Sequence, residues 1–548
     1  MHFRHLFIIL FFLHSKLIAQ QRSYYFIYFK DKPNTVLQKL DLKKYYSEKA
    51  IERRVKYGLP ITADDFPPDS LYTATIISKG ALVVGQSRWF NGVLVLAEPK
   101  IISDSIKPLA FISSVDYAGK YTPSNIEKKE INFDAEFELI EQRLKQRNRD
   151  SLYYGLSHNQ LTQLNVQTLH KNNYWGNGVT IAVLDAGFIN ADKISAVNHL
   201  IKNKKIIGIH DFVEHIDNVF VEDDHGLAVL SCMASNQPGV IMGAAPQANY
   251  ILLRTENART ETLVEEYNWL LGAEYADSAG ADIINSSLGY TKHDEKTMGH
   301  SYNDLNGKTT VVTKAAEMAA QKGMLVFVSA GNEGNDPWRF IAAPADAESV
   351  VTVGAVDKHG HYAGFSSIGP TADKRLKPDV VALGSGAAIL STDGRAYLGN
   401  GTSYACPVLV GASALLVQKH PNVHPKKIKE VILWSGNKAH QPDRFTGYGI
   451  PDMQIADFIL SDQQLFGVAF ARIIGNSFQV VLNAYSPQKV KLTFYGNQGE
   501  SFSQTVQCNE KGLNQFLFPI PKNLKNESIK AIEALFLKSN ANSVFLFN

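Results

Sequence analysis

Short apolar segments alternate with helical patterns through the middle of the chain, between residues 159 and 460. Five apolar segments are predicted to be strands, at residues 179–185, 248–254, 281–289, 323–332 and 349–356. Near-continuous apolar strands are typical of a parallel sheet that is covered on both faces. Because helical stretches such as residues 313–323 lie between them, the pattern predicts an α/β domain with a doubly wound, mostly parallel sheet.

The preceding part of the chain, residues 20–126, has the pattern of a small α+β unit. A helix is predicted over residues 47–58, with Ser47 as its N-cap and Gly58 at its end. Aromatic and β-branched residues predict strands in three further places, at residues 24–30, 89–98 and 111–117.

Helical patterns nearly disappear after residue 460. Residues 461–548 contain short strand-like segments separated by turn residues, which predicts a β-sandwich module. Residues 127–158 are predicted to be a charged linker, because 13 of the 24 residues from 127 to 150 are charged. A solvated helix is the alternative for this stretch. Because such an exposed stretch is open to proteolysis, this linker is a candidate processing region.

The N-terminus has the residue order of a secretory signal peptide. Arg4 and His5 precede the apolar run Leu6–Leu13, and Ala19 is a small residue at a suitable cleavage point. The run is too short for a membrane-spanning helix, which needs about 20 residues, and a buried N-terminal helix is the alternative. We therefore expect residues 1–19 to be a signal peptide. The protein is then secreted, or located at the cell surface or in the periplasm, without a transmembrane segment.

Length and composition add limited information. A chain of 548 residues is too long for one hydrophobic core and predicts several domains. The net charge of +2 gives no indication of nucleic acid or an anionic membrane as a partner. The three cysteines, Cys232, Cys406 and Cys508, have the number and spacing of neither a disulfide framework nor a zinc site. We expect them to be buried packing residues.

Four short segments contain residues that are typical of catalytic sites. Asp185 ends a predicted strand, where the functional groups of open α/β sheets gather, and His225 begins a predicted helix. Asn332 follows another predicted strand, and Ser403 lies near the start of an apolar helix. Each residue also has a purely structural alternative. Asp185 and Ser403 could be helix caps, His225 could be a packed core histidine, and Asn332 could belong to a Gly-Asn turn.

Together these four residues form a chemically consistent set. A serine hydroxyl is a weak nucleophile until a base removes its proton, and the base must be oriented and stabilised once it is charged. His225 is the candidate base, Asp185 orients it, and Ser403 is the candidate nucleophile. The Asn332 amide and the Ser403 N–H are candidate donors to an oxyanion, because the first N–H groups of a helix have no partner within it.

The segments VLDAGF, DHG, SAGNEG and GTSYACP, in this order, resemble the subtilisin-like serine protease family over about residues 160–460. The resemblance implies a serine endopeptidase, a hydrolase that forms an acyl-enzyme on Ser403. It also implies a substrate pocket with two walls, formed by Ser287, Leu288 and Gly289 on one side and by Ala330 and Gly331 on the other. An extended peptide would add to the first wall as a further strand.

The overall layout resembles secreted subtilases of Bacteroidetes-type bacteria, which often carry a C-terminal β module. The N-terminal α+β unit then corresponds to a propeptide that inhibits the enzyme by occupying the active site. The charged linker corresponds to the place where this propeptide is removed. The resemblance thus implies a latent zymogen whose partners are its own propeptide and protein or peptide substrates.

Three places depart from the family's pattern. Leu227 stands where the family has threonine after the histidine, and residues 381–389 stand where it often has an Ala-Pro-Gly turn. Residues 289–310 have the character of an insertion, in which Asp304, Asn306 and Gly307 alternate as in part of a calcium loop. A polar turn is the alternative there. The pattern requires no cofactor, and it leaves calcium binding undecided.

Two other classes of function are alternatives. A binding protein on an inactive protease scaffold would lack one of the four groups, whereas all four are present. A lipase or esterase commonly carries G-x-S-x-G and the chain order Ser, Asp, His. Ser403 follows both Asp185 and His225, and its motif is G-T-S-Y-A, so the order and the motif favour the protease.

Overall fold

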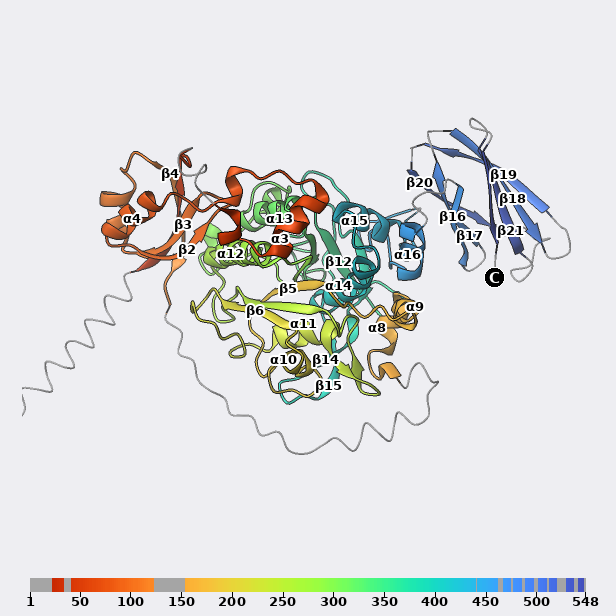
Figure 1. Cartoon of the computed structure of the whole chain (residues 1–548), viewed down its shortest axis with the longest axis horizontal. Coiled ribbons are helices and arrows are strands. Elements are labelled where there is room, and N and C mark those ends of the chain that lie inside the picture. The colour runs from red at the N-terminus through yellow and green to blue at the C-terminus, as the bar shows by residue number, and fades with distance from the viewer. Residues whose placement is uncertain are drawn as a thin grey trace, which may run out of the picture.

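The computed structural model describes most of the expected N-terminal and central units. The described residues are 22–33, 41–122, 153–439, 441–461, 467–474, 477–484, 488–496, 501–509, 512–519, 529–536 and 541–546. The expected signal peptide, residues 1–19, and the linker from residue 127 to 152 lie outside them. Figure 1 shows the α/β unit in the centre, with the N-terminal sheet at one side and the C-terminal strands at the other.

A seven-stranded sheet forms the centre of the molecule, and all its neighbouring strands are parallel. In the order β13-β12-β11-β10-β5-β9-β6, the strands are Val380–Leu383, Val351–Val356, Leu325–Ser329, Ile283–Ser286, Thr180–Asp185, Asn249–Arg254 and Ile206–Asp211. Five of them match the apolar segments, which confirms the predicted sheet. The pattern does not predict the edge strands, because β13 has four residues and β6 is only partly buried.

Helices cover both faces of this sheet. They are α11 (His225–Ala234) and α14 (Thr402–Lys419) on one face, and α12 (Leu263–Ala279) and α13 (Val311–Gln321) on the other. Alternate residues of β5 enter the two cores, Ile181 on the first side and Ala182 on the second. The sheet is therefore buried on both faces, which is why its strands are almost continuously apolar.

Shorter elements surround the sheet. They are α8 (His158–Gln163), α9 (Val166–Lys171), α10 (His199–Lys202), α15 (Pro425–Trp434), α16 (Met453–Ser461), β7 (Asn236–Gln237), β8 (Ile241–Met242), β14 (Ser385–Leu390) and β15 (Ala396–Asn400). Tyr154 already packs in the core, and its hydroxyl lies 3.0 Å from Nδ1 of His170. The expected domain boundary at residue 159 stays a prediction, but chain packing against the sheet begins before it.

The N-terminal unit is an antiparallel sheet with helices. Its strands, in the order β2-β3-β1-β4, are Leu82–Ser87, Gly92–Ala97, Ser23–Phe29 and Ile112–Lys120, and its longer helices are α3 (Glu48–Tyr57) and α4 (Ser70–Ser78). The caps predicted for α3 are confirmed: Ser47 Oγ accepts from the Ala50 N–H at 3.2 Å, and Gly58 has φ +63°. The strand expected from residue 89 begins only at Gly92, because Asn91, with φ +47°, belongs to the turn after β2.

Strand β1 divides its side chains between two cores. Tyr25, Ile27 and Phe29 pack inside the N-terminal unit, whereas Phe26 faces α12 and stacks on Tyr267 with ring centroids 4.5 Å apart. The alternation follows from the two-residue period of a strand. One face of the N-terminal sheet is thus buried against the central unit.

Buried ion pairs also join the N-terminal unit to α12. Asp277 of α12 is fully buried and pairs with Arg53 and, at 2.8 Å, with Arg54. One turn earlier, the Glu274 carboxylate accepts from the N–H groups of Arg88, at 2.8 Å, and Trp89, at 3.2 Å. The last turns of α12 therefore hold the N-terminal unit through buried charges.

The C-terminal strands form two sheets. The first has the order β16-β17-β20 (Gly467–Ile474, Ser477–Ala484, Gly512–Pro519), and the second the order β19-β18-β21-β22 (Ser501–Cys508, Gln488–Gly496, Ile529–Phe536, Ala541–Leu546). Phe478 of one sheet and Phe494 of the other share one core, with ring centroids 5.2 Å apart. The predicted β-sandwich is confirmed.

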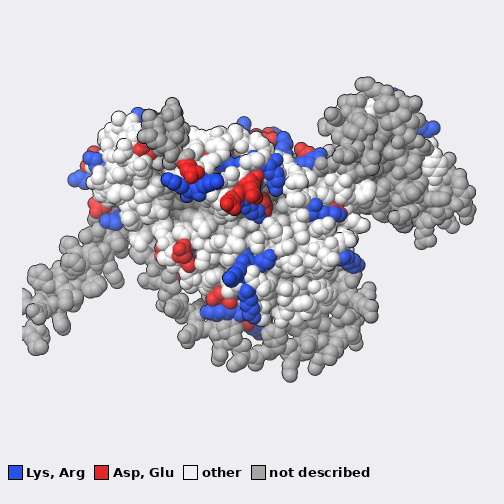
Figure 2. All heavy atoms as spheres, in the orientation of Figure 1, with Lys and Arg blue, Asp and Glu red and all other residues white. Residues whose placement is uncertain are grey.

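The distribution of charge on the surface and the burial of the cysteines agree with what the composition predicted. On the face seen in Figure 2, Lys and Arg are interspersed with Asp and Glu, without a broad patch of one sign. Cys232, Cys406 and Cys508 are free and buried, as expected. Among the described residues, no helix combines the length and the apolar character needed to cross a membrane.

Candidate active site

Asp185 and His225 meet at the carboxyl edge of the sheet. Asp185 ends β5 and is fully buried, and His225 is the first residue of α11. Oδ1 of Asp185 accepts from the Ala186 N–H at 2.8 Å and lies 2.7 Å from Nδ1 of His225. Its Oδ2 has no hydrogen-bond partner among the described residues. The carboxylate is therefore oriented mainly toward the imidazole.

These surroundings change the protonation of His225. Burial lowers the pKa of the imidazole, but the charge and hydrogen bond of Asp185, with the charges of Asp223 and Asp224, outweigh it and raise the pKa to about 9. The side chain keeps 30% exposure, so one side of the ring is open to solvent or a ligand. The site thus stabilises an imidazolium, as a base that takes up a proton requires.

Ser403 is the second residue of α14 and is 8% exposed. Its hydroxyl donates to the Ser287 carbonyl oxygen at 3.2 Å, and the Ser287 hydroxyl donates to the Ser403 carbonyl oxygen at 2.9 Å. In the described part of the chain, no hydrogen bond joins Ser403 to His225. The two residues nevertheless lie in the same region, because the ring of Tyr404, which follows Ser403 in the chain, lies 6.2 Å from the ring of His225.

Asn332 lies in the loop after β11, next to the start of α14. Its Oδ1 accepts from the Thr402 N–H at 2.9 Å and from the Thr402 hydroxyl at 3.0 Å. The amide oxygen is thereby occupied, and Nδ2 makes no hydrogen bond to any described residue. This orientation leaves an N–H donor group beside the N-terminus of α14, where the N–H of Ser403 has no partner within the helix.

The two expected walls of the substrate pocket leave neighbouring strands. β10 and β11 pair in parallel, Ser286 opposite Val328, so that Ser287–Gly289 and Ala330–Gly331 begin at the same edge. Gly331 has φ +104°, a conformation that favours glycine, and its N–H donates to the Thr402 hydroxyl at 3.2 Å. The structure thus brings all nine expected site residues to one region of the sheet edge.

The departures from the family's pattern have simple structural accounts. Leu227 is fully buried in the core below α11, and residues 381–389 form the end of β13 and most of β14. Asp304 accepts from the N–H of Ser301 at 2.8 Å, and Asn306 from the N–H of Lys308 at 3.0 Å. These two side chains close turns within their own segment, which agrees with a polar turn, the alternative to a calcium loop.

Sequence reasoning did not single out some residues of the site. Thr402, which orients Asn332, and Tyr404, which lies beside His225, both belong to the GTSYACP segment, so their place in that motif was a usable signal. Arg53 and Asp277 are separated by 224 residues and carry no such signal.

A doubly wound parallel sheet, with an Asp–His pair and a helix-start serine at its carboxyl edge, is the arrangement of an α/β serine hydrolase. Residues 176–449 match the subtilase family, peptidase S8, and residues 24–133 match the peptidase S8 propeptide domain of Bacteroidota. The chain belongs to the subtilase family and is a serine peptidase with an N-terminal propeptide domain.

Two relatives with similar sequences, serine protease AprX and subtilisin NAT, agree with this assignment. Serine protease AprX of Bacillus subtilis (strain 168) is 30% identical over 286 residues, which are 47% of this chain and 61% of that protein. Subtilisin NAT of Bacillus subtilis subsp. natto is 29% identical over 300 residues, 54% of this chain and 68% of that protein. The structure of MycP1 with its N-terminal propeptide removed aligns over 54% of this chain and 96% of that one, with 24% identity and a TM-score of 0.44.

Proposed function

We propose that the protein is a secreted serine endopeptidase precursor whose catalytic residues are Asp185, His225, Ser403 and Asn332. The observation that carries this proposal is the 2.7 Å contact between Asp185 Oδ1 and His225 Nδ1 beside the start of α14. It supports a histidine held in one tautomer, with Nε2 available as a base. Membership of the subtilase family supports the same assignment.

The first chemical step requires a change at Ser403. Its hydroxyl donates to the Ser287 carbonyl, and in the reaction it donates to Nε2 of His225 instead. An extended peptide that pairs with the backbone at Ser287–Gly289 would place its own N–H on that carbonyl. Substrate binding would thus release the serine hydroxyl at the moment when it is needed.

The remaining steps follow from the positions of the donors. Ser403 Oγ attacks the peptide carbonyl while His225 takes the proton, and Asp185 stabilises the imidazolium. Nδ2 of Asn332 and the N–H of Ser403 donate to the tetrahedral oxyanion. His225 then protonates the leaving amine, and water repeats the sequence on the acyl-enzyme, which yields the second product and regenerates Ser403.

The propeptide domain keeps the precursor latent in this proposal. It docks on α12 through Asp277 and Glu274, and the chain that follows β4 leads into the charged linker, where cleavage would release it. The signal-like residues 1–19 direct the precursor out of the cytoplasm. Protein or peptide substrates then replace the propeptide, and no cofactor takes part in these steps.

A fluorophosphonate probe tests the assignment of the nucleophile. We expect the mature protein to be labelled on Ser403 and the Ser403→Ala variant to remain unlabelled. Ser413→Ala is a matched control, because Ser413 lies on the same helix and its hydroxyl donates to the Leu409 carbonyl at 2.7 Å. Labelling of the Ser403→Ala variant, or loss of labelling in the control alone, contradicts the proposal.

A further inference from the structure

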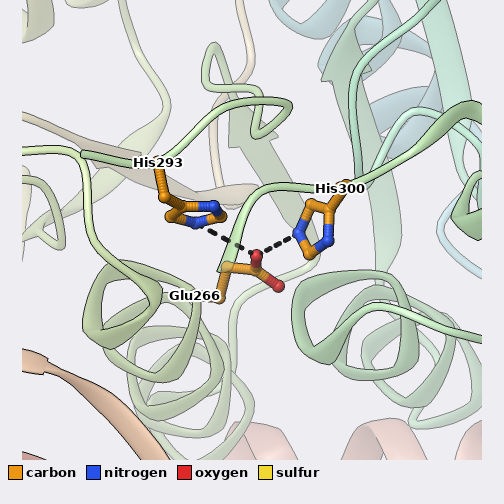
Figure 3. A group of neighbouring side chains, drawn as sticks. All are labelled: Glu266, His293 and His300. Atoms are coloured by element: carbon orange, nitrogen blue, oxygen red, sulfur yellow. Dashed lines mark hydrogen bonds and ion pairs between the residues drawn. The ribbon is translucent and has the colours of Figure 1, made fainter. Parts of the chain in front are cut away.

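Three side chains with metal-binding atoms converge beside the start of α12, and none of them belongs to the catalytic proposal. Glu266 lies in the first turn of α12, and His293 and His300 lie in the segment that follows Gly289. One carboxylate oxygen and one nitrogen from each imidazole lie within 4.8 Å of one another. Figure 3 shows both rings directed at the Glu266 carboxylate.

The carboxylate is held in place from its other side. Glu266 Oε2 accepts from the Val312 N–H at 3.0 Å, at the start of α13. Glu266 Oε1 lies 2.5 Å from Nε2 of His300 and 3.6 Å from Nε2 of His293. One oxygen therefore caps a helix, and the other faces both histidines (Figure 3).

His293 has no satisfactory partner for its ring. Its side chain and that of Glu266 are fully buried, and neither ring nitrogen makes a hydrogen bond to a described residue. The Met298 backbone lies near the ring, but without good hydrogen-bond geometry, and 3.6 Å to Glu266 is also too long. Buried polar atoms without partners are rare in folded proteins and call for an explanation.

An ion pair alone does not explain the cluster. The contact between His300 and Glu266 satisfies these two residues, but it leaves His293 buried and unpaired beside them. A cation between the three side chains would satisfy all of them at once, because it accepts electron pairs from both imidazoles and from the carboxylate.

We propose that Glu266, His293 and His300 bind a divalent transition-metal ion of the Zn²⁺ class. Tetrahedral zinc with bonds of about 2.0–2.1 Å separates its ligand atoms by roughly 3.3 Å. The separations from Glu266 Oε1, 2.5 and 3.6 Å, lie on either side of that value. All three ligand atoms lie within 4.8 Å of one another, so side-chain rotations would bring them to the metal. Imidazole ligands suit zinc and its neighbours, whereas calcium and magnesium require oxygen ligands.

The burial of the ligands assigns the ion a structural role. Two of the three side chains are fully buried and His300 is 11% exposed, so little of the site is open to solvent. The ion would attach the segment after Gly289 to the first turn of α12. Glu295, in the same segment, accepts from the Tyr117 hydroxyl of the propeptide at 2.7 Å. The metal therefore orders a segment that begins at the proposed substrate wall and contacts the propeptide.

Metal binding can be measured without catalysis. The full-length Ser403→Ala precursor, made without a histidine tag and treated with a chelator, is titrated with Zn²⁺ against a fluorescent zinc indicator. We expect one ion per chain, and at least tenfold weaker binding in His293→Ala and in Glu266→Gln. Co²⁺ should produce the visible absorption of a tetrahedral nitrogen–oxygen site in the Ser403→Ala precursor and not in these two variants.

The controls separate this site from adventitious binding. His359 and His361 lie with ring centroids 6.0 Å apart and are exposed, so that the His359→Ala/His361→Ala precursor should bind Zn²⁺ as tightly as its parent. If the parent precursor takes up no Zn²⁺, or if His293→Ala binds it equally well, the proposal is overturned. Zn²⁺ uptake by the parent precursor tests the proposal even when the ligand variants fail to fold, because it does not depend on them.

Discussion

Asn332 and Thr402 are joined by two hydrogen bonds, both accepted by the same amide oxygen. The Thr402 N–H donates at 2.9 Å and the Thr402 hydroxyl at 3.0 Å. Because the Thr402 N–H can only donate, its bond assigns the oxygen to this side of the amide and the NH₂ group to the other. The side chain is thereby oriented before any substrate arrives, which favours stabilisation of a developing oxyanion.

We therefore expect Asn332→Ala to lower kcat by about 10²–10³, with little change in KM; this range belongs to subtilisin itself and is carried over to its relative. Thr402→Val, which removes the hydroxyl and its bonds to Asn332 and Gly331, should lower kcat less, and Thr402→Ser should retain most of it. Steady-state kinetics on a peptide substrate measure these values. An Asn332→Ala enzyme with unchanged kcat would exclude the amide from the oxyanion site.

Self-processing depends on the same nucleophile. The Ser403→Ala precursor, expressed alone, should keep its propeptide attached, because the hydroxyl that would cut the linker is absent. Mass spectrometry of the purified protein gives the N-terminus. Removal of the propeptide at the wild-type position in this variant would show that another protease performs the cut.

Activity should increase with pH through the alkaline range. His225 accepts a proton only when it is neutral, and its pKa is raised from the usual 6.5 to about 9. The acid limb of kcat/KM should therefore lie well above pH 6.5. The sign for stability is opposite: the raised pKa contributes stability below pH 6.5, which is lost as the pH rises through about 9.

A single exposed carboxylate tests the cause of this shift. Asp224 raises the pKa of His225 by its charge, so Asp224→Asn should move the acid limb to lower pH, and more strongly at low salt. Glu430→Gln also removes one exposed negative charge, which pairs with Lys427 on α15, and should leave the profile unchanged. An acid limb that does not move in Asp224→Asn would contradict the electrostatic account.

The propeptide interface should depend on buried charges rather than on exposed ones. Arg53→Ala removes a partner of the fully buried Asp277, which typically costs about 2–5 kcal/mol, or at least roughly 30-fold in affinity. Lys56→Ala, on the same helix, loses an exposed bond to the Pro421 carbonyl and a contact with the Tyr57 ring and should cost less than about 1 kcal/mol. Inhibition of the mature enzyme by propeptide variants measures both, and equal effects would be inconsistent with the buried network.

The three cysteines should be unreactive in the folded protein. Burial raises the pKa of Cys232 to about 12 and that of Cys508 to about 11, and it raises the pKa of Cys406 as well. Iodoacetamide reacts with the thiolate, so alkylation at pH 8 should be slow until a denaturant is added, when three groups react. Rapid alkylation of Cys406 in the native protein would reopen its assignment as a packing residue beside Ser403.

Much of the central unit could be predicted from local patterns. Strands such as β5 and β11 are apolar along their whole length because both faces of the sheet are covered. The caps of α3 at Ser47 and Gly58 could be predicted from the sequence, because a helix cap depends on residues that are neighbours in the chain. The edge strand β6 could not be predicted in this way, because it is only partly buried and its sequence mixes apolar and polar residues.

The sequence by itself determined the family and the four candidate catalytic groups, since each lies in a short motif with its own local signal. Only the tertiary structure decided how these groups are oriented: the Ser403 hydroxyl toward Ser287, and the Asn332 oxygen toward Thr402. It alone decided that Glu266 meets His293 and His300, and that Arg53 meets Asp277. The physical reason is that hydrogen bonds and ion pairs between distant segments depend on packing, which brings together side chains that have no relationship along the chain.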